Sequence, residues 1–295
     1  MQNNKIEVRP VSNCVGAEIS GVDLAEPLSE SAYSEIRQAL CKWGVIFFRD
    51  QNITPDQHLS FGQKFGDLHL SKTIGKVPGH PMVAEVRKDP GETRNIGGNW
   101  HTDHSFAEKP PLGSILVARE LPDSGGDTLF ANLSAAYDGL SEGMQKTLEG
   151  MSAIHAKKKA LQATNLSAER RVSAKEMAKI GEAAQEQFVH PVVARHPETG
   201  RKILYVNPTY TVRFDGWTER ESKPLLQFLF DQVSSPENTC RFRWQEDSVV
   251  FWDNRSVWHY ALNDYHGQRR VLHRVSVAGS EVRASELAIK HIPFA

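Results

Sequence analysis

The sequence contains few cysteines, and their arrangement excludes two kinds of protein. Only three of the 295 residues are cysteine, namely Cys14, Cys41 and Cys240. They are odd in number, lie far apart and form no Cys-x-x-Cys pair. This pattern argues against a disulfide scaffold and against a thiolate zinc site, and it fits a reducing compartment.

Long hydrophobic runs and an excess of one charge are also missing. No apolar run approaches the roughly 20 residues that cross a bilayer, and the first residues have no apolar signal-peptide core. The 35 basic residues nearly balance the 36 acidic ones, which gives a formal net charge of -1. We therefore expect a cytoplasmic protein that has neither nucleic acid nor a membrane as its partner.

Short apolar segments separated by glycine and proline predict the fold class. A helix is expected to end at Gly44, and further helices are expected to begin at Thr54 and Thr218. Strands are expected at 45–48, 114–118, 203–206, 248–252 and 270–277. Many short strands with glycine turns favour a mainly β fold, a sandwich or jelly roll with flanking helices.

The domain organisation follows from the lack of repeats and of low-complexity linkers. We expect a single domain over residues 1–295, with a helical insertion or lid at about 134–190. The insertion carries the basic run Lys157-Lys158-Lys159. Such a run is usually a solvated face of a helix.

Two histidines and one aspartate form the pattern that points to chemistry. His101 and Asp103 are two residues apart, so on an extended backbone their side chains leave from the same face. His259 follows an apolar segment and is the candidate third ligand. Two histidines with one carboxylate are the ligand set of non-haem Fe(II) oxygenases. A lone His-x-Asp is a weak signal, because many histidines are structural.

Two arginines follow in the last expected strand. Arg270 and Arg274 are four positions apart, so both side chains lie on one face of that strand. Two guanidinium groups on one face repel each other unless anions meet them, which favours carboxylate-type ligands. A pair of exposed basic residues remains the alternative on spacing alone.

Several sequence blocks, taken in order, resemble the taurine/phenoxyacetate (TauD/TfdA) family of 2-oxoglutarate-dependent dioxygenases. The resemblance covers nearly the whole chain and is strongest in its last blocks. The matching blocks are Gly16-Ala17-Glu18-Ile19, Trp100-His101-Thr102-Asp103, Gly125-Gly126-Asp127-Thr128, His190-Pro191-Val192-Val193, Trp252-Asp253-Asn254-Arg255, Asp264-Tyr265, Arg269-Arg270 and His273-Arg274.

The resemblance implies a fold, a reaction and cofactors. The fold would be a double-stranded β-helix, or jelly roll. The two histidines and the aspartate would bind Fe(II), and Arg270 with the Thr128 hydroxyl would hold 2-oxoglutarate. Arg274 would bind the anionic group of a small organic substrate. The enzyme would hydroxylate that substrate with dioxygen while 2-oxoglutarate is decarboxylated to succinate and CO2.

The sequence departs from the family pattern at several positions around the substrate. Ser71 stands where the taurine enzymes have a second histidine, while His69 is retained. Lys157 stands near a position that is aromatic in those enzymes, and Gly97 replaces an asparagine. Asn99 is expected to shape the site. These changes weaken taurine as substrate and leave a sulfonate, an aryloxyalkanoate or a related carboxylate or sulfate ester open.

Two other classes of function are compatible with parts of this pattern. A zinc-dependent hydrolase could use the same His-x-Asp and distal histidine to activate water, but it leaves Arg270 and Thr128 unexplained. A non-enzymatic jelly roll that binds acids could keep the fold without the chemistry. The resemblance also implies a homo-oligomer, either a dimer or a tetramer.

Overall fold

The computed structural model describes residues 5–70, 74–157 and 185–285, and these form two compact units. The first unit comprises residues 1–103, 111–132 and 235–280, and the second comprises 104–110, 133–234 and 281–295. In the described ranges, no helix is long and apolar enough to cross a membrane. The predicted single domain with an insertion at about 134–190 stays a prediction, since residues 158–184 lie outside the described ones.

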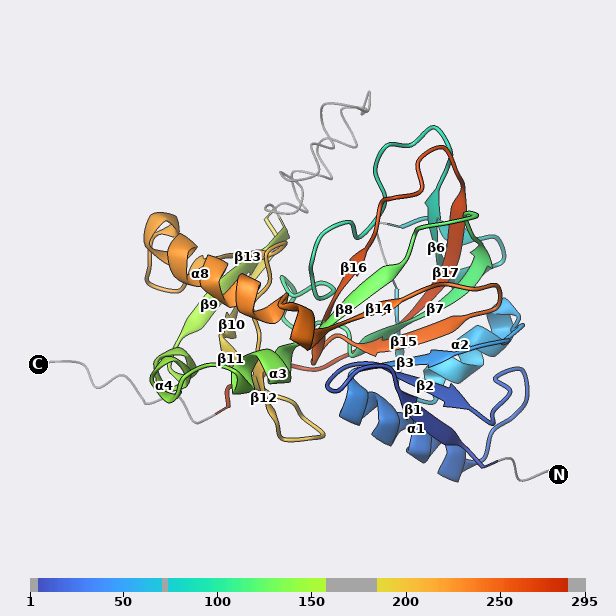
Figure 1. Ribbon diagram of the computed structural model, residues 1–295, viewed down its shortest axis with the longest axis horizontal. Helices are drawn as coiled ribbons and strands as arrows, with labels where there is room; N and C mark the ends of the chain where they lie inside the picture. Colours follow the sequence, from blue (N-terminus) through green and yellow to red (C-terminus); the bar gives the residue numbers. More distant parts are fainter. Residues whose placement is uncertain (1–4, 71–73, 158–184, 286–295) are drawn as a thin grey trace, which may run out of the picture. The chain divides into compact units, whose positions relative to one another are not determined.

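The first unit contains two β-sheets that pack face to face. The large sheet has the strand order β1-β2-β3-β15-β7-β17-β6-β5, and β4 pairs with β17. Its strands are β1 (Glu7–Pro10), β2 (Ala17–Ser20), β3 (Val45–Phe48), β4 (Leu68–His69), β5 (Lys76–Val77), β6 (His80–Lys88), β7 (Gly113–Glu120), β15 (Val249–Asp253) and β17 (Arg270–Val277). The small sheet, with β8 in the middle (Figure 1), consists of β14 (Thr239–Phe242), β8 (Thr128–Asn132) and β16 (Val257–Ala261).

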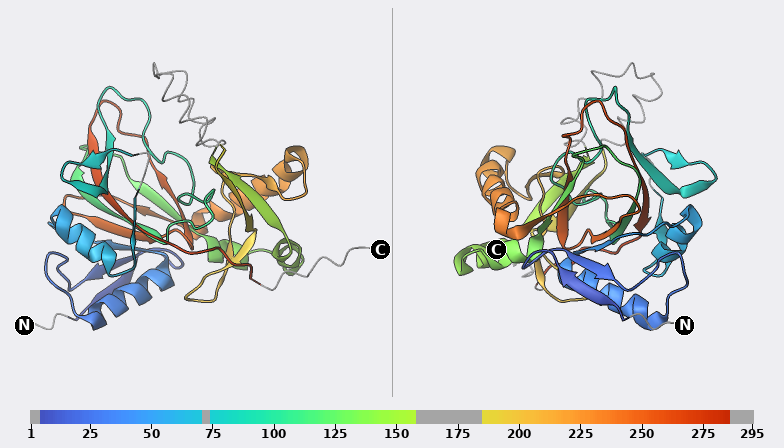
Figure 2. Two further views of the ribbon diagram at one scale, coloured as in Figure 1. Left: turned by 180° about the vertical axis from the view of Figure 1, so that it is seen from behind. Right: turned by 45° about the vertical axis from the view of Figure 1, so that its right-hand side comes forward.

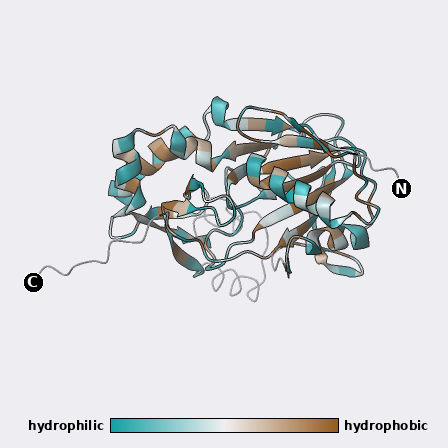
Figure 3. Cartoon of the chain, turned by 90° about the horizontal axis from the view of Figure 1, so that it is seen from below, coloured by the Kyte–Doolittle hydropathy of each residue, from teal (hydrophilic) through white to brown (hydrophobic). Residues whose placement is uncertain are grey.

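Alternating side chains of the large sheet form two separate cores. On β15, Val249 and Phe251 join a cluster with residues of the two N-terminal helices, whereas Val250 and Trp252 join a cluster with the small sheet. This is the period of two expected of a strand that is buried on both faces. Figure 3 shows hydrophobic colour along several strands of the chain. A mainly β jelly roll with flanking helices, as predicted, is confirmed.

Two helices cover the outer face of the large sheet. They are α1 (Glu30–Trp43) and α2 (Pro55–Gln63). Helix α1 packs on β3 and β15 and lies beneath β1 and β2 in the right-hand view of Figure 2. Gly44 ends α1, and a capping box at Thr54 begins α2, both as predicted. Helix α2 stops at Gln63, where the amides of Lys64 and Phe65 bond three residues back and tighten the turn.

The described part of the second unit combines short strands with three helices. Its described elements are α3 (Leu133–Asp138), α4 (Glu142–Glu149), β9 (Ser152–Ala156), β10 (Gln187–Pro191), β11 (Val193–Arg195), β12 (Lys202–Leu204), β13 (Thr211–Phe214) and α8 (Glu219–Val233). Strands β10, β9 and β13 form one sheet and β11 pairs with β12. A capping box at Thr218 begins α8, as predicted. A 3-10 turn, Pro236–Asn238, belongs to the first unit.

Candidate metal and cosubstrate site

Backbone pairing places the two predicted histidine ligands side by side. His101 and His259 form an isolated antiparallel bridge, in which each backbone N–H donates to the carbonyl of the other at 3.1 and 2.8 Å. His259 belongs to β16, so the small sheet fixes its position. Because directly paired residues point to the same face, their rings lie 4.0 Å apart between centroids.

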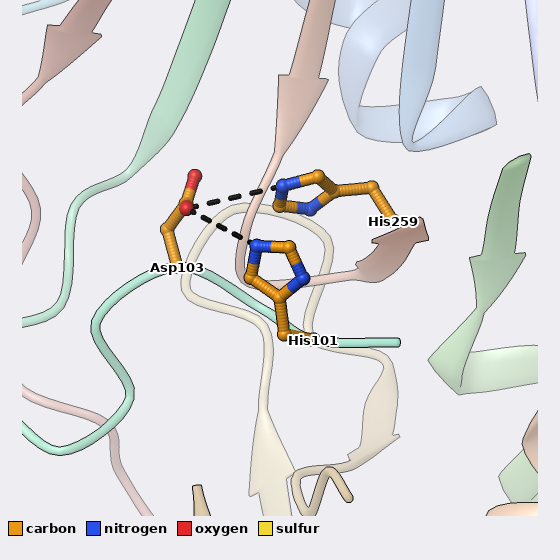
Figure 4. A group of neighbouring side chains, drawn as sticks. All are labelled: His101, Asp103 and His259. Carbon is orange, nitrogen blue, oxygen red and sulfur yellow. Dashed lines mark ion pairs between the residues drawn. The ribbon is translucent and has the colours of Figure 1, made fainter. Parts of the chain in front are cut away.

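Asp103 completes a buried group of three possible metal ligands. Its Oδ1 lies 3.7 Å from His101 Nε2 and 3.9 Å from His259 Nε2. One ligand atom from each residue lies within 4.8 Å of the others, and all three side chains are buried. Figure 4 shows the carboxylate facing both imidazole rings. The structure therefore brings together the three residues that the sequence singled out.

The protonation state of the histidines suits metal binding. The Nδ1 atom of His101 lies 2.7 Å from the Asn99 carbonyl, which can only accept, so Nδ1 carries the proton and Nε2 can offer its lone pair to a metal. Burial lowers the pKa of His101, and it lowers that of His259 strongly, with repulsion from His101 as a further cause. Neutral imidazoles and a carboxylate are the donors that Fe(II) takes in this geometry.

The second oxygen of Asp103 is held by two other residues. Its Oδ2 accepts from Arg274 Nη2 at 2.7 Å and from Ser114 Oγ at 3.2 Å. Arg274 Nε also donates to Ser276 Oγ at 3.2 Å. These contacts leave Oδ1 directed at the histidines. Sequence reasoning missed Ser114 and Ser276, since only the register of β7 and β17 places these two serines opposite each other.

Arg270 is a buried cation with unsatisfied donors. Its side chain is 4% exposed, and in the described part of the chain its Nε and Nη2 atoms have no hydrogen-bond partner. Its Cζ lies 5.4 Å from the ring centre of Trp244, whose Nε1 donates to the Thr128 hydroxyl at 3.0 Å. The ring centre of Tyr265 lies 5.9 Å from the same Cζ. Two free, buried N–H groups of a guanidinium fit a bidentate carboxylate such as that of 2-oxoglutarate.

Two glycines leave room for these residues. Gly126 has φ of +70°, and a Cβ there would lie 3.1 Å from Arg270 Cδ and 3.2 Å from its Nε. Gly97 has φ of +81°, and a Cβ there would lie 3.3 Å from His101 Cε1. A larger residue at either position would be strained and would press on the site. The residue that departs from the family pattern at Gly97 therefore lies against a predicted ligand.

The remaining predicted substrate residues are placed differently. His69 lies opposite Ser276 in the pairing of β4 with β17, so it shares the face of Arg274. Asn99 is exposed and contributes its backbone carbonyl to His101. Lys157 lies in the second unit, where it pairs with Glu186 at 3.3 Å. Ser71 lies outside the described residues. Substrate binding by these four residues stays a prediction.

Comparison with known proteins agrees with this geometry. Two histidines and one carboxylate in the interior of a jelly roll are typical of a non-haem iron oxygenase. The family model described as "Taurine catabolism dioxygenase TauD, TfdA family" matches residues 7–276. The chain therefore belongs to the TauD/TfdA family.

Individual relatives share most of their length with this chain. An alkylsulfatase of Acinetobacter baylyi is 35% identical over 276 residues, which cover 93% of this chain and 86% of that protein. An alpha-ketoglutarate-dependent sulfate ester dioxygenase of Pseudomonas putida is 33% identical, covering 93% and 90%. The crystal structure of a taurine dioxygenase from Burkholderia xenovorans has a TM-score of 0.76 and 36% identity, covering 94% and 90%.

These matches confirm two of the predictions made from the sequence. The protein is a 2-oxoglutarate-dependent dioxygenase, an oxidoreductase, and its cofactor set is Fe(II), 2-oxoglutarate and dioxygen. The matches give no support to the zinc hydrolase alternative.

Proposed function

We propose that this enzyme hydroxylates a small organic anion, and that sulfate esters are its main class of substrate. The buried guanidinium of Arg274, bonded to the carboxylate that faces both histidines, is the observation that supports an anionic substrate. Two relatives named as an alkylsulfatase and a sulfate ester dioxygenase favour sulfate esters. A sulfonate, an aryloxyalkanoate and another carboxylate remain in the same class of small anions.

In this proposal His101, Asp103 and His259 hold the metal. Bound Fe(II), together with 2-oxoglutarate and dioxygen, supplies the oxidising chemistry that hydroxylates an unactivated C–H bond. The Asn99 carbonyl keeps the His101 proton on Nδ1. Arg274 and Ser114 fix the outer oxygen of Asp103, so the inner oxygen keeps its direction.

Arg270 and Thr128 hold the cosubstrate in this proposal. The unsatisfied Nε and Nη2 atoms of Arg270 would donate to the distal carboxylate of 2-oxoglutarate. The Thr128 hydroxyl accepts from Trp244, so its own proton is available to a carboxylate oxygen. The rings of Trp244 and Tyr265 lie beside the guanidinium. They would shield the ion pair between Arg270 and the carboxylate from solvent.

The substrate end of the site would use Arg274, with His69 on the same sheet face and Ser71, Asn99 and Lys157 as the further predicted contacts. Anchoring the anion sets which carbon meets the oxidising centre.

With a sulfate ester, that carbon bears the ester oxygen. Hydroxylation there gives an unstable product whose C–O bond to sulfate breaks, so an aldehyde, sulfate and a proton are released.

The test is a panel of alkyl sulfates, alkanesulfonates, aryloxyalkanoates and alkanoates, read by succinate release with Fe(II) and ascorbate. We expect alkyl sulfates to stimulate succinate formation most, with one aldehyde and one sulfate formed for each succinate. Sulfate release that needs neither 2-oxoglutarate nor dioxygen, and that Zn(II) supports, would instead identify a hydrolase. Turnover of 2-oxoglutarate that no acid stimulates would contradict the proposal.

A further inference from the structure

Lys76 is a cation near Arg274 that no sequence motif singles out. It begins β5, at the edge of the large sheet, and lies opposite Ala84 of β6. Ala84 in turn lies opposite Arg274 of β17. Residues directly opposite each other in antiparallel strands point to the same face of the sheet. Lys76, Ala84 and Arg274 therefore form one row across the sheet, on the face from which Arg274 bonds Asp103.

The middle position of this row is small. Adjacent strands are about 4.8 Å apart, so the Cα atoms of Lys76 and Arg274 are separated by about 10 Å. Ala84 projects only a methyl group between them. The long side chains of lysine and arginine can therefore meet above Ala84. Partial burial, and next to it repulsion from the Arg274 guanidinium, lower the pKa of Lys76, so the two charges do interact.

The charge of Arg274 is already partly compensated. Its Nη2 atom donates to Asp103 at 2.7 Å and its Nε atom to Ser276 at 3.2 Å. An organic anion that approaches Arg274 also approaches the carboxylate of Asp103, which repels it. A second cation in the same row offsets that repulsion, and Lys76 lies where such a cation is needed.

We propose that Lys76 and Arg274 bind the charged headgroup of the substrate together, and that Lys76 makes the site prefer sulfate and sulfonate over carboxylate. The inference rests on the proposed function, namely that the substrate is a small organic anion. A carboxylate has two oxygens in one plane, which one guanidinium can satisfy. A sulfate or sulfonate group has three terminal oxygens in a tripod, so one oxygen remains for the ammonium group of Lys76.

The experiment uses the full chain with Fe(II) and 2-oxoglutarate and three probes of equal length: hexyl sulfate, hexane-1-sulfonate and hexanoate. We expect Lys76→Ala to raise KM for hexyl sulfate about 10- to 100-fold. The kcat and the KM for 2-oxoglutarate should stay within about twofold, and the preference for hexyl sulfate over hexanoate should largely disappear. Lys76→Arg should restore most of the affinity, because it keeps a long cationic donor.

A matched control removes one lysine charge elsewhere in the same unit. Lys64 is exposed and pairs with Glu30 at 2.9 Å. Lys64→Ala should leave the KM for every probe unchanged, which separates a local contact from an effect of net charge.

A binding measurement separates this inference from the proposed function. Hexyl sulfate, hexane-1-sulfonate and hexanoate are each titrated calorimetrically into the anaerobic enzyme with Fe(II) and 2-oxoglutarate, as wild type and as Lys76→Ala. Weaker binding of hexyl sulfate by Lys76→Ala supports the inference, even if the wild-type enzyme forms no aldehyde. The absence of aldehyde would contradict only the proposed function. If the wild-type enzyme turns over hexyl sulfate, and Lys76→Ala binds it with the same affinity and the same KM, only the inference is overturned. Wild type that binds none of the three probes overturns both.

Discussion

Arg270 and Arg274 lie on the same face of β17, yet their surroundings differ. Arg270 is buried with two N–H groups that have no partner among the described residues, so both can donate to an anion. Arg274 is buried with its Nη2 bonded to Asp103 and its Nε to Ser276. Under the proposed function, Arg270 is therefore prepared for one carboxylate of 2-oxoglutarate, whereas the charge of Arg274 is partly neutralised, so we expect a further cation to help it select the organic anion.

The largest expected effect comes from removing the unsatisfied arginine. Arg270→Ala should raise KM for 2-oxoglutarate by about 100-fold or more, because a buried charged hydrogen-bond pair is lost. The KM for the organic acid, measured at saturating 2-oxoglutarate, should change by less than about threefold. Arg87→Ala is the control, since Arg87 lies on β6 and pairs with Glu85 and Asp89. If Arg270→Ala raised both KM values equally, the expected difference between Arg270 and Arg274 would be wrong.

The reverse pattern is expected at the other end of the strand. Arg274→Ala should raise KM for the organic acid about 30- to 100-fold while KM for 2-oxoglutarate changes little. Arg274→Lys should recover only part of the affinity, because an ammonium group cannot bond Asp103 and Ser276 with the same planar geometry. Steady-state kinetics with each substrate varied in turn measure both values. If only the KM for 2-oxoglutarate rose, Arg274 would bind 2-oxoglutarate and not the organic acid, and the prediction would be wrong.

A smaller effect should follow from crowding Arg270 without removing it. Gly126→Ala places a Cβ 3.1 Å from Arg270 Cδ at a φ of +70°, so the guanidinium must shift. We expect KM for 2-oxoglutarate to rise about 10-fold and the melting temperature to fall by several degrees, from about 1–3 kcal/mol of strain. Gly91→Ala, in open space, is the control. An unchanged KM for 2-oxoglutarate would show that Arg270 does not need its present position.

The smallest effect is expected from a change at Ser114, which donates an uncharged hydrogen bond to Asp103. Ser114→Ala removes one hydrogen bond to Oδ2 and leaves the stronger bond from Arg274. The apparent affinity for Mn(II), used as an inert replacement for Fe(II) in calorimetry, should fall about 3- to 10-fold. Both KM values measured with saturating Fe(II) should stay within about twofold. A loss of metal affinity above 100-fold would mean that Ser114, not Arg274, orients the carboxylate.

The sequence predicted those features that depend on local pattern. Short apolar segments located β3 and β15, a further strand was expected at β17, and the caps at Gly44 and Thr54 located α1 and α2. The spacing of His101 and Asp103, with a distal histidine, located the three residues that the structure groups within 4.8 Å. Each of these signals is contained in a few neighbouring residues or in an ordered set of motifs.

The features that sequence reasoning missed depend on register between distant strands. Ser114 and Arg274 reach the same carboxylate oxygen, although they are far apart in the sequence and on different strands. Lys76 reaches the row of Arg274 only because β5 pairs with β6 at Ala84, next to an irregularity in the register. A shift of one residue would turn Lys76 to the other face, and no local pattern fixes that register.

The backbone bridge between His101 and His259 has a consequence for how this enzyme can change over evolutionary time. Two main-chain hydrogen bonds, which any pair of residues could form, fix the spacing of the two imidazole-bearing positions. Residues around the predicted substrate end, other than Arg274 with its bond to Asp103, can therefore be exchanged without moving the two histidines. A scaffold of this kind lets substrate range diversify by mutation while the oxidising chemistry is inherited unchanged.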